Sequence, residues 1–137
     1  MQEKHNPDIV ADCANLHFLP SNHYQEILAK DILEHIERIK TQAVLQEWAR
    51  LLQTGGRLFL QVPSVLDLMK MIEQTDNVEV HLRCIHFLFG TQAYTGDYHL
   101  TSFTTETLTY YLNNAGFKII KISLTDGWMF TVEATKN

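Results

Sequence analysis

Residues 48–63, WARLLQTGGRLFLQVP, place a helix end, a Gly-Gly pair and an apolar strand in direct succession. Gly55 and Gly56 predict the end of the helix, because glycine tolerates the left-handed backbone of a C′ position. The run from Arg57 to Val62 predicts a buried strand, and Pro63 ends it because proline has no N–H to donate to a sheet. This order of elements is typical of one unit of an open α/β sheet.

The residues before this unit predict two strands and a helix. Asp8–Ala11 (DIVA) is a short apolar run that ends at the acidic Asp12, and Tyr24–Ala29 (YQEILA) is a second apolar run. Between residues 32 and 55 the apolar side chains recur every three or four positions, which predicts a helix, broken near Thr41.

The residues after the unit predict two further helices. Ser64 can cap a helix over Val65–Glu73, because its hydroxyl can accept a hydrogen bond from the first turn. Thr104 or Thr105 can cap a second helix that runs to Asn114. Residues 74–101 between these helices predict no regular element, and we expect an insertion or lid that is partly ordered.

The C-terminal residues predict a β-hairpin. Lys118–Leu124 and Trp128–Ala134 are apolar runs that Thr125-Asp126-Gly127 separates. An Asp-Gly pair between two such runs is a strong hairpin pattern, so these strands should be antiparallel. The 137 residues can bury one core, and we expect a single domain over residues 1–137.

Composition and charge exclude several classes of function. Eleven basic against sixteen acidic side chains give a net charge of −5, and no window gathers the lysines and arginines that nucleic acid requires. No apolar run approaches the length of a membrane span or a secretory leader, so we expect no membrane association. Cys13 and Cys84 lie far apart without a CxxC spacing, which favours a reducing cytoplasm.

Three stretches together resemble the class I S-adenosylmethionine-dependent methyltransferases of the type 11 kind. They are residues 48–63, residues 10–36 (VADCANLHFLPSNHYQEILAKDILEHI) and residues 96–122 (GDYHLTSFTTETLTYYLNNAGFKIIKI). The resemblance covers the second half of the family fold. It implies an α/β class, as a truncated Rossmann-like methyltransferase sheet that is mostly parallel and ends in an antiparallel hairpin.

The resemblance also implies where S-adenosylmethionine would bind. The carboxylate of Asp12 would accept a hydrogen bond from the adenine amino group, and the backbone N–H of Cys13 would reach a ring nitrogen. Lys30 and Asp31 would lie near the methionine portion and the transferred methyl group. His35 would face the same cavity as a polar wall or base. Two alternatives stay open: Asp12 can cap the following turn, and His35 can be a solvated surface residue.

The acceptor side is less defined. His99 and Tyr94 are candidates to line it, with Asp97 as an alternative base to His35 and His99, although a polar loop with aromatic anchors explains the same residues. The acceptor could be a small molecule, a glycan or a lipid. His81, Cys84 and His86 have metal-ligating side chains, but their spacing matches no zinc pattern, so we expect no metal site.

The glycine-rich cofactor loop of the family does not occur before Gly55, which is the first of six glycines. We therefore expect a fragment of a longer enzyme, a five-stranded sheet in which Asp8–Ala11 pairs directly with Tyr24–Ala29, or a partner chain that adds strands at an exposed edge. The resemblance favours a partial methyltransferase domain. The alternative is a methyltransferase-like module that acts by protein association and has no catalytic activity.

Overall fold

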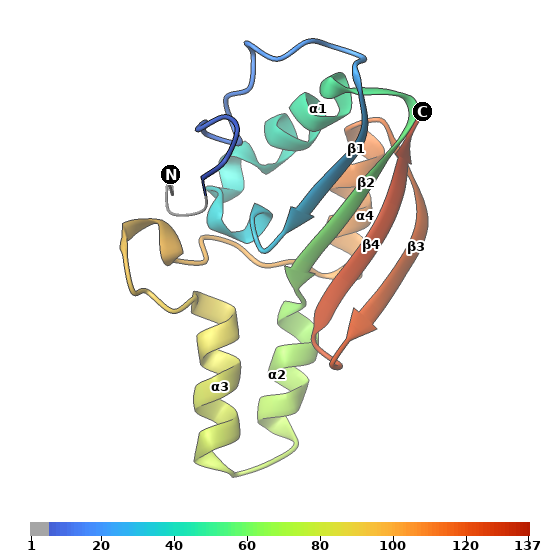
Figure 1. The fold of residues 1–137 in the computed structure, drawn as a ribbon. Helices are drawn as coiled ribbons and strands as arrows, with labels where there is room; N and C mark the ends of the chain where they lie inside the picture. Colours follow the sequence, from blue (N-terminus) through green and yellow to red (C-terminus); the bar gives the residue numbers. More distant parts are fainter. Residues whose placement is uncertain (1–5) are drawn as a thin grey trace.

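A computed structural model describes residues 6–137 as a mixed α/β fold around one four-stranded sheet (Figure 1). The strands lie in the order β1-β2-β4-β3, and their bounds are β1 (Tyr24–Lys30), β2 (Leu52–Pro63), β3 (Phe117–Thr125) and β4 (Met129–Lys136). β1 and β2 are parallel, whereas β4 is antiparallel to both β2 and β3.

The expectation of a mostly parallel sheet is therefore wrong, because only the β1–β2 pairing is parallel. The physical reason is the C-terminal hairpin, which returns β4 into the position beside β2 and so makes both of its pairings antiparallel. The hairpin itself is confirmed. Asp126 and Gly127 have φ values of 57° and 80°, as a tight hairpin turn requires.

Two helices, α1 (Thr41–Leu51) and α4 (Thr105–Asn114), cover one face of the sheet (Figure 1). The helix predicted from residue 32 begins only at Thr41, and two short 3-10 turns, η1 (Leu33–His35) and η2 (Arg38–Lys40), replace its first half. The buried core lies between these helices and the inward side chains of the strands, and includes Leu45, Trp48, Leu58, Leu60, Leu108, Leu112, Phe117 and Val132.

The predicted helix end at Gly55 is wrong, because α1 ends at Leu51 and β2 begins at Leu52. The fully buried Leu52 already has an extended backbone and pairs with Tyr24. Gly55, with φ 79°, lies instead within β2, where the pairing with β1 is irregular. Glycine is used at this position for the kink of a strand, and not for a helix cap.

A helical hairpin of α2 (Val65–Glu73) and α3 (Val78–Phe89) projects beyond the carboxyl ends of β1 and β2 (Figure 1). The cap of α2 is as predicted, since the Ser64 hydroxyl accepts a hydrogen bond from the Asp67 N–H. The structure places α3 in the middle of residues 74–101, for which the sequence predicted no regular element. No helix in residues 6–137 is both long and apolar enough to span a membrane.

Asp8–Ala11 is not a strand, and the expected five-stranded sheet is wrong as well. Ile9 and Val10 remain 53% and 44% exposed, so little burial favours their pairing with β1. The residues that follow are instead attached to α1: Trp48 Nε1 donates to the Cys13 carbonyl at 3.1 Å, and Arg50 donates to the Leu16 carbonyl at 3.1 Å. Within residues 6–137, β2 is the one strand that pairs with β1.

Candidate functional site

The candidate site lies at the carboxyl ends of the parallel strands β1 and β2, where open α/β sheets bind ligands. Asp31 follows β1 directly with a φ of 54°, and its N–H donates to the Gln61 carbonyl of β2 at 3.1 Å. This left-handed residue turns the chain sharply into η1, which carries Glu34 and His35. Two neighbouring cavities open at this end of the sheet, and Asp31 and His35 line both of them.

The larger cavity has a volume of about 890 Å³, within the range of small-molecule sites. All four residues expected to bind the cofactor line it, together with His35 and Tyr94; the four are Asp12, Cys13, Lys30 and Asp31. The turn-capping alternative for Asp12 is also present, because its Oδ1 accepts a hydrogen bond from the Ala14 N–H at 2.9 Å. The carboxylate thus lines the cavity while one of its oxygens holds the turn.

Cys13 contributes a weakly acidic thiol to this cavity. Burial raises the pKa of the thiol, and the negative charge of Asp12 raises it further. The thiol is therefore a poor nucleophile at neutral pH. Cys13 and the buried Cys84 are both free cysteines.

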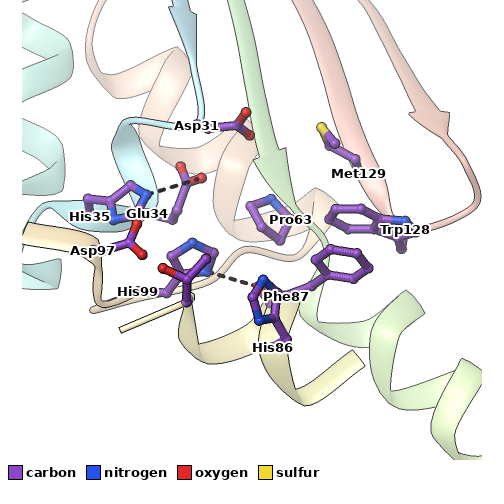
Figure 2. Close-up of a pocket in the computed structure, with 12 residues that line it drawn as sticks. Asp31, Glu34, His35, Pro63, His86, Phe87, Asp97, His99, Trp128 and Met129 are labelled. Atoms are coloured by element: carbon purple, nitrogen blue, oxygen red, sulfur yellow. Dashed lines mark hydrogen bonds and ion pairs between the residues drawn. The ribbon is translucent and has the colours of Figure 1, made fainter. Parts of the chain in front are cut away.

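The smaller cavity has a volume of about 270 Å³ and lies between η1, α3 and the β3–β4 turn (Figure 2). It brings together the two expected catalytic residues. The rings of His35 and His99 meet edge to face, with centroids 4.7 Å apart and an interplanar angle of 83°. Asp97 lines this cavity as well, whereas Tyr94 lines the larger one. Whether any of these residues acts in catalysis stays a prediction.

Backbone hydrogen bonds hold the two histidines in place. His35 Nδ1 lies 3.1 Å from the Tyr98 carbonyl oxygen, and His99 Nδ1 lies 2.8 Å from the Phe87 carbonyl oxygen. Because a carbonyl only accepts, each Nδ1 must carry the proton, and each Nε2 of the neutral ring keeps a free lone pair. The Leu100 N–H donates to the Glu34 carbonyl at 2.8 Å, which ties the same segments together.

Glu34 is a residue of this site that the sequence analysis missed. Its side chain is 1% exposed, and its Oε2 is buried without a hydrogen-bond partner. Burial raises the pKa of this carboxyl group to about 8, and the nearby charge of Asp31 raises it too. The spacing of apolar residues after position 32 gave no reason to expect that the side chain of Glu34 is buried.

His99 has an environment that favours the neutral ring. Burial lowers its pKa, and a charged His35 would lower it further, while the hydrogen bond to Phe87 and the carboxylates of Asp97 and Asp31 act in the opposite direction. A neutral imidazole at pH 7 is able to accept a proton.

An aromatic pair that the sequence analysis also missed forms the opposite wall. Phe87 of α3 and Trp128 of the hairpin turn stack with centroids 3.9 Å apart and an interplanar angle of 10° (Figure 2). The pairing could not be found from sequence, because 40 residues, which include α4 and β3, separate Phe87 from Trp128. It gives the smaller cavity a flat apolar surface.

The three metal-ligating side chains of α3 do not converge. His81 Nε2 bonds to the carbonyl oxygen of Ile72 at 2.9 Å, Cys84 is buried, and His86 is exposed. Among residues 6–137, the one group of at least three side chains close enough to share a metal ion is made by other residues, Glu34, His35 and His99.

Gly90 ends α3 with φ 83° and ψ 171°, a conformation that is essentially restricted to glycine. A Cβ here would overlap the Asp97 carbonyl oxygen and lie 3.1 Å from the backbone nitrogen of His99. We expect Gly90→Ala to lower the free energy of unfolding by about 1–3 kcal/mol, measured by urea denaturation. Gly96→Ala is the matched control, since its Cβ would meet only the Tyr94 ring at 3.4 Å or more. Equal denaturation midpoints for the two variants would contradict the prediction.

Comparisons with known proteins identify the fold. No family model and no curated protein matches the sequence. Among solved structures, an S-adenosylmethionine-dependent methyltransferase from Methanosarcina mazei superposes with a TM-score of 0.65 at 15% identity, over 93% of this chain and 66% of that one. Magnesium protoporphyrin IX methyltransferase from Synechocystis PCC 6803, with bound S-adenosylhomocysteine, gives 0.58 at 21% identity, over 94% and 50%.

A third match is 1,6-didemethyltoxoflavin-N1-methyltransferase from Burkholderia thailandensis, with bound 1,6-didemethyltoxoflavin and S-adenosylhomocysteine. It gives a TM-score of 0.61 at 14% identity, over 94% of this chain and 50% of that one. The chain thus spans between half and two thirds of the length of these three structures. Residues 6–137 have the class I methyltransferase fold over this part of its length, as the sequence motifs predicted.

Proposed function

We propose that this chain is part of an S-adenosylmethionine-dependent methyltransferase and that the cofactor occupies the larger cavity. The observation that carries the proposal is the convergence of Asp12, Cys13, Lys30 and Asp31 on one cavity at the carboxyl ends of the parallel strands. These residues come from two segments of chain, and the family resemblance assigns all four of them to the cofactor. Structural neighbours carry S-adenosylhomocysteine on the same fold.

In this proposal Asp12 and Asp31 have distinct roles. Asp12 accepts a hydrogen bond from the adenine amino group through Oδ2, because Oδ1 is already bonded to Ala14. Asp31 lies near the sulfonium, where its negative charge is favourable and offsets the unfavourable charge of Lys30. The sulfonium is already an activated methyl donor, so the protein has chiefly to align the acceptor.

The smaller cavity would then hold the methyl acceptor, since Asp31 and His35 form a boundary that both cavities share. Its volume suits part of a small molecule, and the stacked Phe87 and Trp128 favour a flat group. His99, or His35, would accept the proton of the acceptor. Residues 74–101, which provide Phe87 and His99, would act as the lid over it. The cytoplasmic location expected from the free cysteines stays a prediction.

The test is a calorimetric titration of the folded chain with S-adenosylhomocysteine. We expect saturable binding, and we expect Asp12→Ala to weaken it by about tenfold, as the loss of a hydrogen bond to a carboxylate does. Asp76→Ala is the matched control, because Asp76 is an exposed carboxylate in the α2–α3 loop. Binding that Asp12→Ala leaves unchanged would refute the assignment of the cavity.

The alternative function, association with a protein partner, is favoured by one observation. β1 pairs on one side only within residues 6–137, and an apolar groove of about 260 Å³ runs along it, where Leu28 is 62% exposed. A second copy of the chain or another protein could add strands at this edge. A folded chain that self-associates in sedimentation measurements, and neither binds S-adenosylhomocysteine nor changes its association with it, would favour this alternative.

A further inference from the structure

Three side chains that can ligate a metal meet at the boundary between the two cavities. They are Glu34 and His35 of η1 and His99 of the segment after η3, and one ligand atom from each lies within 4.8 Å of the other two. Figure 2 shows them on one side of the smaller cavity. From this arrangement we propose that Glu34, His35 and His99 form a binding site for a divalent first-row transition metal ion. The proposal does not depend on the methyltransferase function, and a bound ion would occupy the Nε2 lone pairs, so neither histidine would act as a base while the ion is bound.

The ligand atoms lie slightly farther apart than they would around a bound ion. His35 Nε2 lies 4.0 Å from Glu34 Oε1. A tetrahedral zinc ion with bonds of about 2.0–2.1 Å needs ligand atoms about 3.3 Å apart. Glu34 and His35 therefore have to approach by about 0.7 Å, and the other pairs by at most about 1.5 Å, when the ion binds.

Both histidines are already in the tautomer that a metal needs. Each Nδ1 is used by a backbone carbonyl, that of Tyr98 for His35 and that of Phe87 for His99. The Nε2 atoms are thus left as the electron-pair donors, and the carbonyls fix the ring planes. Metal-ligating histidines in proteins characteristically make such an outer hydrogen bond through their second nitrogen.

A second observation that favours a bound ion is the carboxyl group of Glu34, which has an oxygen without a partner. Its side chain is 1% exposed, and the buried Oε2 has no hydrogen-bond partner in the described structure. Buried carboxylates are normally paired or coordinate metals. The carboxylates of Asp31 and Asp97 line the same cavity and add negative charge around the position of the ion.

The donor set decides the class of metal. Two imidazoles and one carboxylate favour zinc or another first-row transition ion over magnesium and calcium, which prefer oxygen ligands. Three protein ligands leave at least one position open, as in catalytic zinc sites. Because His35 lines both cavities, that position would be available to water or to an oxygen or nitrogen donor of a molecule bound there.

The first test is a competitive titration of the EDTA-treated chain with Zn²⁺, and with Co²⁺, whose visible absorption reports the ligand set. We expect one ion per chain, and at least about tenfold weaker binding for His35→Ala and for His99→Ala. His23→Ala is the matched control, because His23 is exposed, precedes β1 and lines neither cavity. We expect its affinity and Co²⁺ spectrum to equal those of the unaltered chain.

The second test needs no substitution, so a variant that fails to fold does not prevent a decision. In nitrogen-15 spectra of the histidine rings, Zn²⁺ should shift the Nε2 resonances of two histidines while their Nδ1 atoms stay protonated. The absence of one-to-one binding, binding unaffected by His35→Ala and His99→Ala, or displacement of Zn²⁺ by an equal concentration of Mg²⁺ would overturn the proposal. Loss of S-adenosylhomocysteine binding would not, because Zn²⁺ is titrated alone.

Discussion

Trp48→Ala is expected to lower the free energy of unfolding by about 3–5 kcal/mol, the usual result of removing a large buried aromatic side chain. Trp48 is 3% exposed on the inner face of α1, within the cluster that joins the helices to the sheet. Its indole N–H also donates to the Cys13 carbonyl at 3.1 Å. The substitution therefore creates a core cavity and leaves a carbonyl group without its partner. Since a domain of this size is stable by about 5–15 kcal/mol, the loss is a large fraction of the total.

Urea denaturation followed by circular dichroism measures this effect, and two further variants separate its components. Trp48→Phe keeps most of the buried volume and removes the N–H, so we expect a loss of about 1–2 kcal/mol. Tyr110→Ala removes an aromatic ring that is 63% exposed on α4, and its effect should stay within about 0.5 kcal/mol. If Trp48→Ala were no more destabilising than Tyr110→Ala, the position of α1 against the sheet would be wrong.

Glu34→Gln is expected to stabilise the metal-free protein at alkaline pH. The carboxyl group has an ordinary pKa of 4.5 and a pKa of about 8 in the folded chain. Below pH 4.5 both states are protonated, and no stability is lost. As the pH rises from 4.5 to about 8, the unfolded chain releases the proton that the folded chain retains, so stability falls. At about 1.4 kcal/mol for each pKa unit, the loss reaches at most about 5 kcal/mol above pH 8.

The glutamine side chain does not titrate, so the stability of this variant should change less between pH 5 and pH 9 than that of the unaltered chain. The measurement is the free energy of unfolding in EDTA at several pH values for both proteins. Glu37→Gln is the control, because Glu37 lies two residues past η1 and pairs at the surface with Lys40. Parallel pH profiles for Glu34→Gln and the unaltered chain would show that Glu34 is solvated.

The sequence predicted those elements whose ends are marked by capping or turn residues. The cap at Ser64, the N-cap of α4 and the Asp126-Gly127 turn were all local patterns, and each is present in the structure. Local patterns failed where burial decides the outcome. Leu52 is extended because its side chain is buried against the sheet, although the sequence continues the helical spacing up to Gly55. Asp8–Ala11 resembles a strand, but its exposed side chains gain little from pairing.

The candidate site shows the same division. The family motifs had selected Asp12, Lys30, Asp31 and His35, and the structure gathers these residues around one cavity. Glu34 was missed because its significance depends on two properties that a sequence does not display, burial and the absence of a partner for Oε2. Trp128 was missed because its stacking on Phe87 depends on how α3 lies against the hairpin turn.

The hydrogen bond from His35 to the Tyr98 carbonyl closes a loop of 63 residues that contains α1, β2, α2 and α3. Closing so long a loop costs conformational entropy, and the unfolded chain has no contacts that offset this cost. The contact between η1 and the segment around His99 is therefore a property of the folded chain. A molecule or ion held between η1 and this segment binds only the folded chain. By mass action, the unfolding temperature of the chain then rises with the concentration of that molecule or ion.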